Sequence, residues 1–227
     1  DKFMSKGIIY VMSTVFPGLI KIGKTGTDSF ESRMYQLERN GYNNVVGLKR
    51  EFAIEVEDYD EKEVLLDEIF SKSKVHNSEL FALDIDLVKQ LLSSFEGKQV
   101  YPEAITKEEV FTQASEEHKD KIGTESIPDG VYYVKRKIKG FGEACGKIRV
   151  EKGLFITLKG AKCAPIKGSK TPALRKSANI KNNILQEDIM TNSPLTAAWI
   201  IIGASNNGWS EIKTKDGTPI DVFRKNK

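Results

Sequence analysis

Residues 7–25, GIIYVMSTVFPGLIKIGKT, decide how the first part of the chain folds. Two short apolar runs separated by a Pro-Gly turn are typical of two strands that form a hairpin. Because side chains alternate between the faces of a strand, we predict that Tyr10 and Lys21 point toward one cleft. An ordinary hairpin on a half-exposed sheet is the simpler alternative. The apolar side chains predicted on the opposite, buried face are Ile9, Val11, Ile20 and Ile22.

The residues after the hairpin predict a helix, a third strand and two further helices. Residues 28–39 repeat apolar side chains at helical spacing, and residues 51–57 alternate in the manner of a strand. Further helices are expected from about Asp58 and over residues 84–94. Together these elements predict an α+β domain over residues 1–95, with an antiparallel three-stranded sheet and flanking helices. The second helix is expected to bury Val64, Leu65, Ile69 and Phe70.

Residues 96–127 are acidic and polar, with four Lys and Arg against eight Asp and Glu. Their few apolar side chains are too sparse to predict a core element. We therefore expect an acidic linker here that contains an exposed helix.

Residues 128–227 predict a second α+β domain. Short alternating strands separated by glycines come first, a polar helix is expected over residues 172–184, and a hairpin closes the chain. Between them lies SPLTAAWIIIG, residues 193–203. This stretch predicts a buried helix with Ser193 as N-cap, Pro194 in the first turn and Gly203 at its end.

Charge is divided unevenly along the chain. Residues 1–100 carry 13 Lys and Arg against 17 Asp and Glu, whereas residues 128–227 carry 19 against eight, a net charge of +11. A basic domain attracts polyanions, so we expect the second domain to bind DNA; a basic domain that is merely soluble is the alternative. Trp209 lies in this domain and is a candidate for stacking on bases; a position in the core is the alternative.

Other features narrow the class of protein. The longest apolar stretch is well short of the ~20 residues that a membrane helix needs, so we expect no contact with a membrane. The start of the chain lacks the apolar core of a secretory signal. Cys145 and Cys163 have no histidine nearby and are expected to be two reduced thiols rather than zinc ligands. These features predict a cytoplasmic protein.

Several short motifs occur in order across the first domain. IIY (residues 8–10) is followed ten residues later by KIG (residues 21–23), an R-x-x-x-L pattern begins at Arg33, and ELF starts at Glu79. In these motifs, residues 7 to about 95 resemble the GIY-YIG nucleases. The closest resemblance is to the subfamily named after a phage T5 open reading frame, whose members often read KIG where others read YIG.

This resemblance implies an endonuclease that hydrolyses phosphodiester bonds in DNA with one divalent metal. Glu79 would bind Mg²⁺ or Mn²⁺ and leave most of the coordination to water and substrate oxygens. Arg33 would bind the scissile phosphate through its planar guanidinium. Tyr10 would orient or deprotonate the attacking water, and the Lys21 ammonium would favour its tyrosinate form. Lys24 would add a phosphate contact.

Two residues depart from the family's pattern. Ile8 stands where the signature has glycine, and Asp67 stands where relatives often carry histidine. His76, three residues before Glu79, is a candidate replacement for that histidine. The departures keep open an alternative function, in which a degenerate nuclease domain no longer cleaves and the protein binds DNA or reads modified DNA.

Five small motifs of the second domain also occur in the order of a known family. Over about residues 160–225 the chain resembles a family of unknown function found beside restriction-modification proteins, and the related RAMA domain (restriction enzyme adenine methylase associated). The resemblance implies DNA binding in restriction or phage defence. A second copy of the chain or other defence-system proteins would be partners. The motifs are Ser193-Pro194, Ala197-Ala198, Gly203, Asn206-Asn207-Gly208-Trp209 and Asp216-Gly217.

Overall fold

The computed structural model describes residues 5–224 and divides the chain into two units, Asp1–His118 and Lys119–Lys227. Both units contain helices and antiparallel strands, so the predicted α+β class is confirmed. The first unit carries 14 Lys and Arg against 22 Asp and Glu, a net charge of −8. The second carries 21 against ten, a net charge of +11. The polyanion-attracting charge therefore lies in the second unit.

The first unit is built on a five-stranded antiparallel sheet in the order β4-β2-β1-β3-β5. The three predicted strands form its centre, and two short strands that the sequence pattern did not predict extend it at the edges. The strands are β1 (Gly7–Ser13), β2 (Leu19–Thr25), β3 (Lys49–Val56), β4 (Leu80–Ala82) and β5 (Lys98–Tyr101).

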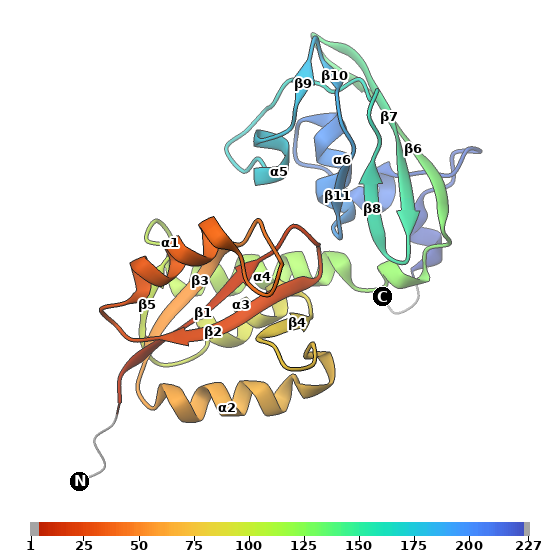
Figure 1. Cartoon of the computed structure of the whole chain (residues 1–227). Helices are drawn as coiled ribbons and strands as arrows, with labels where there is room; N and C mark the ends of the chain where they lie inside the picture. The colour runs from red at the N-terminus through yellow and green to blue at the C-terminus, as the bar shows by residue number, and fades with distance from the viewer. Residues whose placement is uncertain (1–4, 225–227) are drawn as a thin grey trace. The chain divides into compact units, whose positions relative to one another are not determined.

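Helices cover both faces of this sheet (Figure 1). On one face, α1 packs against the side of β1 that carries Tyr10 and Met12. On the other face, α2, α3 and α4 pack against the side that carries Ile9 and Val11. Both faces are thus buried, which does not fit the alternative of an ordinary hairpin on a half-exposed sheet. The helices are α1 (Phe30–Asn40), α2 (Tyr59–Ile69), α3 (Ile85–Ser93) and α4 (Lys107–Lys121), and a short 3₁₀ helix, η1, spans Ser71–Ser73.

The helix α2 packs differently from the prediction, although Phe70, which follows it, is buried as expected. On α2 the fully buried side chain is Leu66, whereas Val64, Leu65 and Ile69 are exposed. Val64, Leu65 and Leu66 are consecutive, so their positions alone do not show which of them faces the core. The sequence pattern favoured Val64 and Leu65, but the structure buries Leu66.

The segment 96–127 differs from the expected linker. Its first part forms β5, which pairs with β3, and its middle forms α4. Val110 and Ala114 of α4 are buried, and Val110 belongs to the core of the first unit. Two side chains four residues apart give one narrow apolar stripe, which is enough to hold the helix on the sheet.

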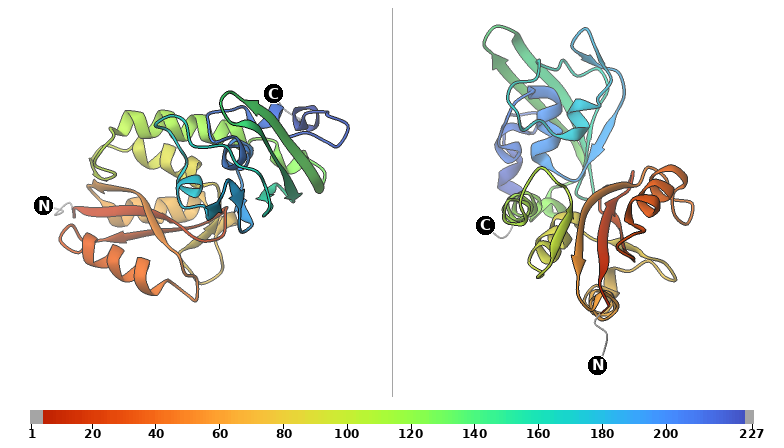
Figure 2. Two further views of the ribbon diagram at one scale, coloured as in Figure 1. Left: turned by 90° about the horizontal axis from the view of Figure 1, so that it is seen from above. Right: turned by 90° about the vertical axis from the view of Figure 1, so that its left-hand side faces the viewer.

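The second unit contains a four-stranded antiparallel sheet in the order β11-β8-β7-β6 and a separate two-stranded ribbon, β10-β9. Helix α6 lies against one face of the larger sheet (Figures 1 and 2). The strands are β6 (Gly130–Ile138), β7 (Gly142–Glu151), β8 (Leu154–Thr157), β9 (Ile180–Lys181), β10 (Ile184–Leu185) and β11 (Ile189–Thr191). The helices are η2 (Thr124–Ser126), α5 (Ala173–Lys176), α6 (Pro194–Ile202), α7 (Gly208–Glu211) and η3 (Ile220–Phe223).

The start and end of α6 are those that the sequence predicts. The Ser193 side chain accepts a hydrogen bond from the Thr196 N–H, Pro194 begins the helix, and Gly203 ends it with a φ of 73°. Trp199 and the isoleucines that follow it are buried. This helix supplies much of the core of the second unit.

Other parts of the second unit differ from expectation. The polar helix predicted over 172–184 is only the four-residue α5, and the ribbon β9-β10 follows it. The closing segment turns at Gly217, as predicted, but its two sides meet only in an isolated bridge, and α7 precedes them.

Cys145 and Cys163 are free thiols. Among residues 5–224, no helix has the length and apolar character needed to cross a membrane.

Candidate functional site

Strands β1 and β2 bring Tyr10 and Lys21 together. Tyr10 pairs with Gly23 in the antiparallel ladder, and Lys21 lies two residues before Gly23, on the same face of the sheet. The Lys21 Nζ donates a hydrogen bond of 3.0 Å to the Tyr10 Oη. The predicted pairing of these two side chains is therefore present in the structure.

Gly23 makes room for this pair. A Cβ atom added to Gly23 would lie 2.5 Å from the Tyr10 Oη and 2.6 Å from the Lys21 Nζ, closer than real Cβ atoms approach. The space where a side chain of residue 23 would lie is thus filled by the phenol and the ammonium. This explains why glycine follows Lys21-Ile22.

We expect Gly23→Ala to lower the free energy of unfolding by ~1–3 kcal/mol, because overpacking a buried site displaces its neighbours. Gly26→Ala is the matched control, since a Cβ there would approach no closer than 3.9 Å to another residue. Urea unfolding of both variants measures the difference. Equal stability of the two variants would contradict the close packing at Gly23.

Glu79 joins the pair from a third segment. It directly precedes β4, which pairs with β2 so that Leu80 lies opposite Lys21, and its carbonyl oxygen accepts a hydrogen bond from the Ile22 N–H. The Glu79 Oε2 lies 2.6 Å from the Lys21 Nζ. The side chain of Lys21 is 0% exposed and that of Glu79 is 40% exposed. We call Tyr10, Lys21 and Glu79 the buried triad, after the buried ammonium at its centre.

Tyr42 also lies beside the Lys21 ammonium, and it was not predicted from the sequence as a site residue. Its ring centre lies 4.9 Å from the Lys21 Nζ, and its Oη accepts a hydrogen bond from the Glu79 N–H. Tyr42 is held by a tight turn in which Asn43 and Asn44 both have positive φ, a conformation that asparagine tolerates. The Asn-Asn pair signals the turn, but nothing in the sequence signals that this turn reaches Glu79.

The electrostatics of the buried triad rest on Lys21. Removing an ammonium from water costs several kcal/mol, and a carboxylate with good geometry is needed to offset that cost. Glu79 supplies the opposite charge, and the rings of Tyr10 and Tyr42 lie within 5 Å of the cation. Tyr10 is only 1% exposed, so it does not face an open cleft as predicted. Glu79 is the member of the triad that reaches solvent.

Glu79 and His76 line the same pocket, of about 550 Å³, together with Tyr42. His76 is exposed at its rim. Asp67, which stands where histidine was expected, forms a 2.9 Å ion pair with Lys74, another lining residue. Among residues 5–224, no three His, Cys, Asp or Glu side chains lie close enough together to hold a metal ion. A metal here would have Glu79 as its protein carboxylate.

The structure does not place Arg33 in contact with the triad. Arg33 is half-buried on α1, the helix that covers the Tyr10 face of the sheet. Within the described part of the chain its guanidinium forms no ion pair or side-chain hydrogen bond. Its charge is therefore unneutralised by the protein.

Lys24 lies on the opposite face of the sheet from Lys21. It pairs with Asp60 at 2.7 Å and Glu63 at 2.6 Å, both on α2. Hydrogen bonds to these two carboxylates raise the pKa of Lys24 above its usual value. Lys24 lies three positions after Lys21, so the two side chains point to opposite faces of the sheet, and the phosphate contact expected of Lys24 does not lie beside Lys21.

Trp209 is a core residue. It is 2% exposed, its Nε1–H donates a 2.7 Å hydrogen bond to the Asp120 carbonyl, and the Arg224 guanidinium lies over its ring. The expected stacking of this indole on a base is not compatible with that burial.

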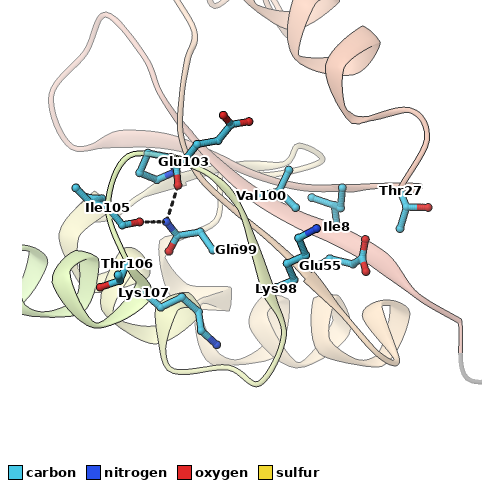
Figure 3. Close-up of a pocket in the computed structure, with 11 residues that line it drawn as sticks. Ile8, Thr27, Glu55, Lys98, Gln99, Val100, Glu103, Ile105, Thr106 and Lys107 are labelled. Carbon is cyan, nitrogen blue, oxygen red and sulfur yellow. Dashed lines mark hydrogen bonds between the residues drawn. The ribbon is translucent and has the colours of Figure 1, made fainter.

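A second pocket of the first unit, of about 520 Å³, lies along β5 (Figure 3). Gln99 donates hydrogen bonds to the carbonyls of Pro102 and Ile105 at its wall. Both signs of charge line this pocket, and none of the predicted site residues does. The charged residues are Glu55, Lys98, Glu103 and Lys107.

Comparison with known proteins adds one likeness. A family model described as "Domain of unknown function (DUF4357)" matches residues 144–224, which lie wholly in the second unit. No curated protein and no solved structure was found to match the chain.

Proposed function

We propose that the first unit hydrolyses phosphodiester bonds of DNA and that the second unit binds the polyanion, in a protein of restriction or phage defence. The observation that carries this proposal is the Lys21 ammonium, fully buried between the Tyr10 hydroxyl and the Glu79 carboxylate. Three separate segments converge on this cation. A buried cation paired with a carboxylate that lines a pocket is a candidate for a functional site.

Glu79 is the group suited to hold the divalent cation, Mg²⁺ or Mn²⁺. Its carboxylate oxygens are the ligands that such ions prefer, its side chain reaches the pocket, and within residues 5–224 its Oε1 accepts no hydrogen bond. When bound, such an ion would neutralise charge on the phosphate and make a bound water more acidic.

Tyr10 would orient or deprotonate the attacking water, with the Lys21 ammonium beside it. The Lys21 N–H donates to the Tyr10 oxygen at 3.0 Å, so negative charge that develops on this oxygen is stabilised. Tyr10 is 1% exposed and Glu79 is the member of the triad that reaches solvent, so the proposal requires a movement that brings water to the Tyr10 hydroxyl. Arg33, which forms no ion pair within residues 5–224, is the candidate for binding the scissile phosphate.

One observation favours the alternative function, a DNA-binding protein that does not cleave. The Lys21 ammonium lies 2.6 Å from the Glu79 carboxylate and neutralises part of the carboxylate's charge without a metal. A divalent cation at the same carboxylate would be repelled by Lys21. The two candidates therefore differ in whether a cation can compete with Lys21 for Glu79.

The test uses the full chain and supercoiled plasmid DNA. We expect nicked or linear DNA in the presence of Mg²⁺ or Mn²⁺, and no cleavage after the cation is removed with EDTA. DNA retained in a mobility-shift assay but left intact with either cation, on modified and unmodified DNA alike, would establish the non-cleaving alternative.

A further inference from the structure

Arg175 is a buried cation that the chain does not neutralise. It lies on α5 of the second unit and is 8% exposed. Its Nη2 donates a 3.0 Å hydrogen bond to the Ala164 carbonyl, and its Nε is buried without a partner. Within residues 5–224, no carboxylate forms an ion pair with this guanidinium.

The chain segment that contains Arg175 carries no carboxylate. Residues 152–186 contain eight Lys and Arg and no Asp or Glu. The buried Cys163 thiol is close enough to interact with Arg175, but burial raises its pKa to about 11, so it is neutral at pH 7. Desolvation lowers the pKa of Arg175 below its usual value. An unpaired buried charge is costly, and an anionic ligand would offset that cost.

The backbone around Arg175 is fixed in place. The Ala164 N–H donates to the Ile201 carbonyl and the Lys167 N–H to the Gly203 carbonyl, so this loop is tied to the end of α6. Gly203 packs so closely on Ala164 that a Cβ there would lie 2.6 Å from its carbonyl oxygen. The guanidinium is thus held by a preorganised frame, which lowers the cost of binding.

Exposed lysines follow the same segment. Within the described residues none of them forms an ion pair, so their charges are free to act on a ligand. A planar guanidinium with exposed lysines on the same chain segment is suited to phosphate oxygens, although the Lys162 ammonium also lies 5.3 Å from the Phe141 ring centre. These lysines are Lys162, Lys167, Lys170 and Lys176.

We propose that Arg175, with the lysines of residues 162–176, forms a binding site for a phosphate group, either of a DNA backbone or of free phosphate. The site deepens the proposed function, because it names where the second unit would hold DNA. It needs no cleavage by the first unit.

The experiment compares wild type, Arg175→Met and the control Arg136→Met in the full chain. Arg136 is matched in charge but is already paired with Glu211 at 3.1 Å. Binding to a labelled DNA duplex is measured in EDTA, which separates binding from cleavage, and melting temperature is measured with and without inorganic phosphate. We expect Arg175→Met to weaken DNA binding by ~10-fold or more, since it removes charge-assisted hydrogen bonds.

Arg175→Met should also abolish the rise in melting temperature that phosphate produces, while Arg136→Met behaves as wild type. If phosphate stabilises through Arg175 but DNA affinity does not depend on it, the ligand is free phosphate. Wild-type binding of both probes by Arg175→Met would overturn the site. Arg175-dependent DNA binding without any cleavage would reject the nuclease and keep the site.

If Arg175→Met does not fold, Arg175→Lys replaces it in the same two measurements. Lysine keeps the charge but loses the planar pair of donors. A folded Arg175→Lys protein with weakened DNA and phosphate binding supports the site, and unchanged binding overturns it.

Discussion

Replacing Glu79 with glutamine is expected to reduce DNA cleavage by ~10³-fold or more, because a carboxylate-bound cation supplies several kcal/mol of transition-state stabilisation and each ~1.4 kcal/mol is tenfold in rate. Glutamine keeps the size of the side chain but loses the charge that holds the cation. The substitution leaves the fully buried Lys21 ammonium without its carboxylate, so the free energy of unfolding should also fall, by ~3–5 kcal/mol. Cleavage is therefore compared at a temperature at which the variant is folded, and DNA affinity should change little.

The chain contains a matched control for this variant. Glu63 lies 2.6 Å from the Lys24 Nζ on the opposite face of the sheet, the same separation as that between Glu79 and Lys21. Glu63→Gln removes a carboxylate from a lysine pair outside the candidate site, where Lys24 is partly exposed and keeps Asp60 as a partner. Cleavage rates under single-turnover conditions should separate the two variants. Full activity of Glu79→Gln would reject Glu79 as the metal ligand.

Replacing Lys21 with methionine is expected to reduce the cleavage rate by ~10²–10⁴-fold, the range for losing a positioned proton-transfer or charge-stabilising group. Methionine has a similar unbranched chain and can fill the same space. The exposed Glu79 carboxylate would then be solvated rather than left buried. The destabilisation caused by a buried charge left without its partner is therefore avoided, so the free energy of unfolding should change far less than the rate does.

Lys24→Met is the matched control for Lys21→Met. Lys24 is on the same strand, and its side chain is 37% exposed between Asp60 and Glu63. Such partly exposed pairs contribute ~0–1 kcal/mol, and they lie on the other face of the sheet. A loss of activity shared by both variants, or a collapse of stability in Lys21→Met, would contradict the catalytic role of Lys21.

The sequence predicted the elements whose local signals are strong. Alternation placed Tyr10 and Lys21 on one side of the hairpin, and the caps at Ser193 and Gly203 defined α6 to the residue. Strands β4 and β5 were missed because three or four residues carry too little periodicity. The helix α4 was expected to be exposed because its buried stripe is only two residues long.

The candidate site was predicted in part. Glu79 could be linked to the hairpin only through a resemblance, since the ion pair with Lys21 spans 58 positions of the chain. Tyr42 and Arg175 carry no local signal, because their roles arise from tertiary contacts and burial. Trp209 was misjudged because a tryptophan in a basic stretch of sequence predicts base stacking. In the structure its ring is buried in the core of the second unit.

The most direct measurement is plasmid cleavage in Mg²⁺ by wild type and the two matched pairs of variants in one experiment. The buried triad predicts that Glu79→Gln and Lys21→Met are inactive, while Glu63→Gln and Lys24→Met cleave at the wild-type rate. Equal rates for all four variants, or losses confined to Glu63→Gln and Lys24→Met, would contradict a hydrolytic centre at Tyr10, Lys21 and Glu79.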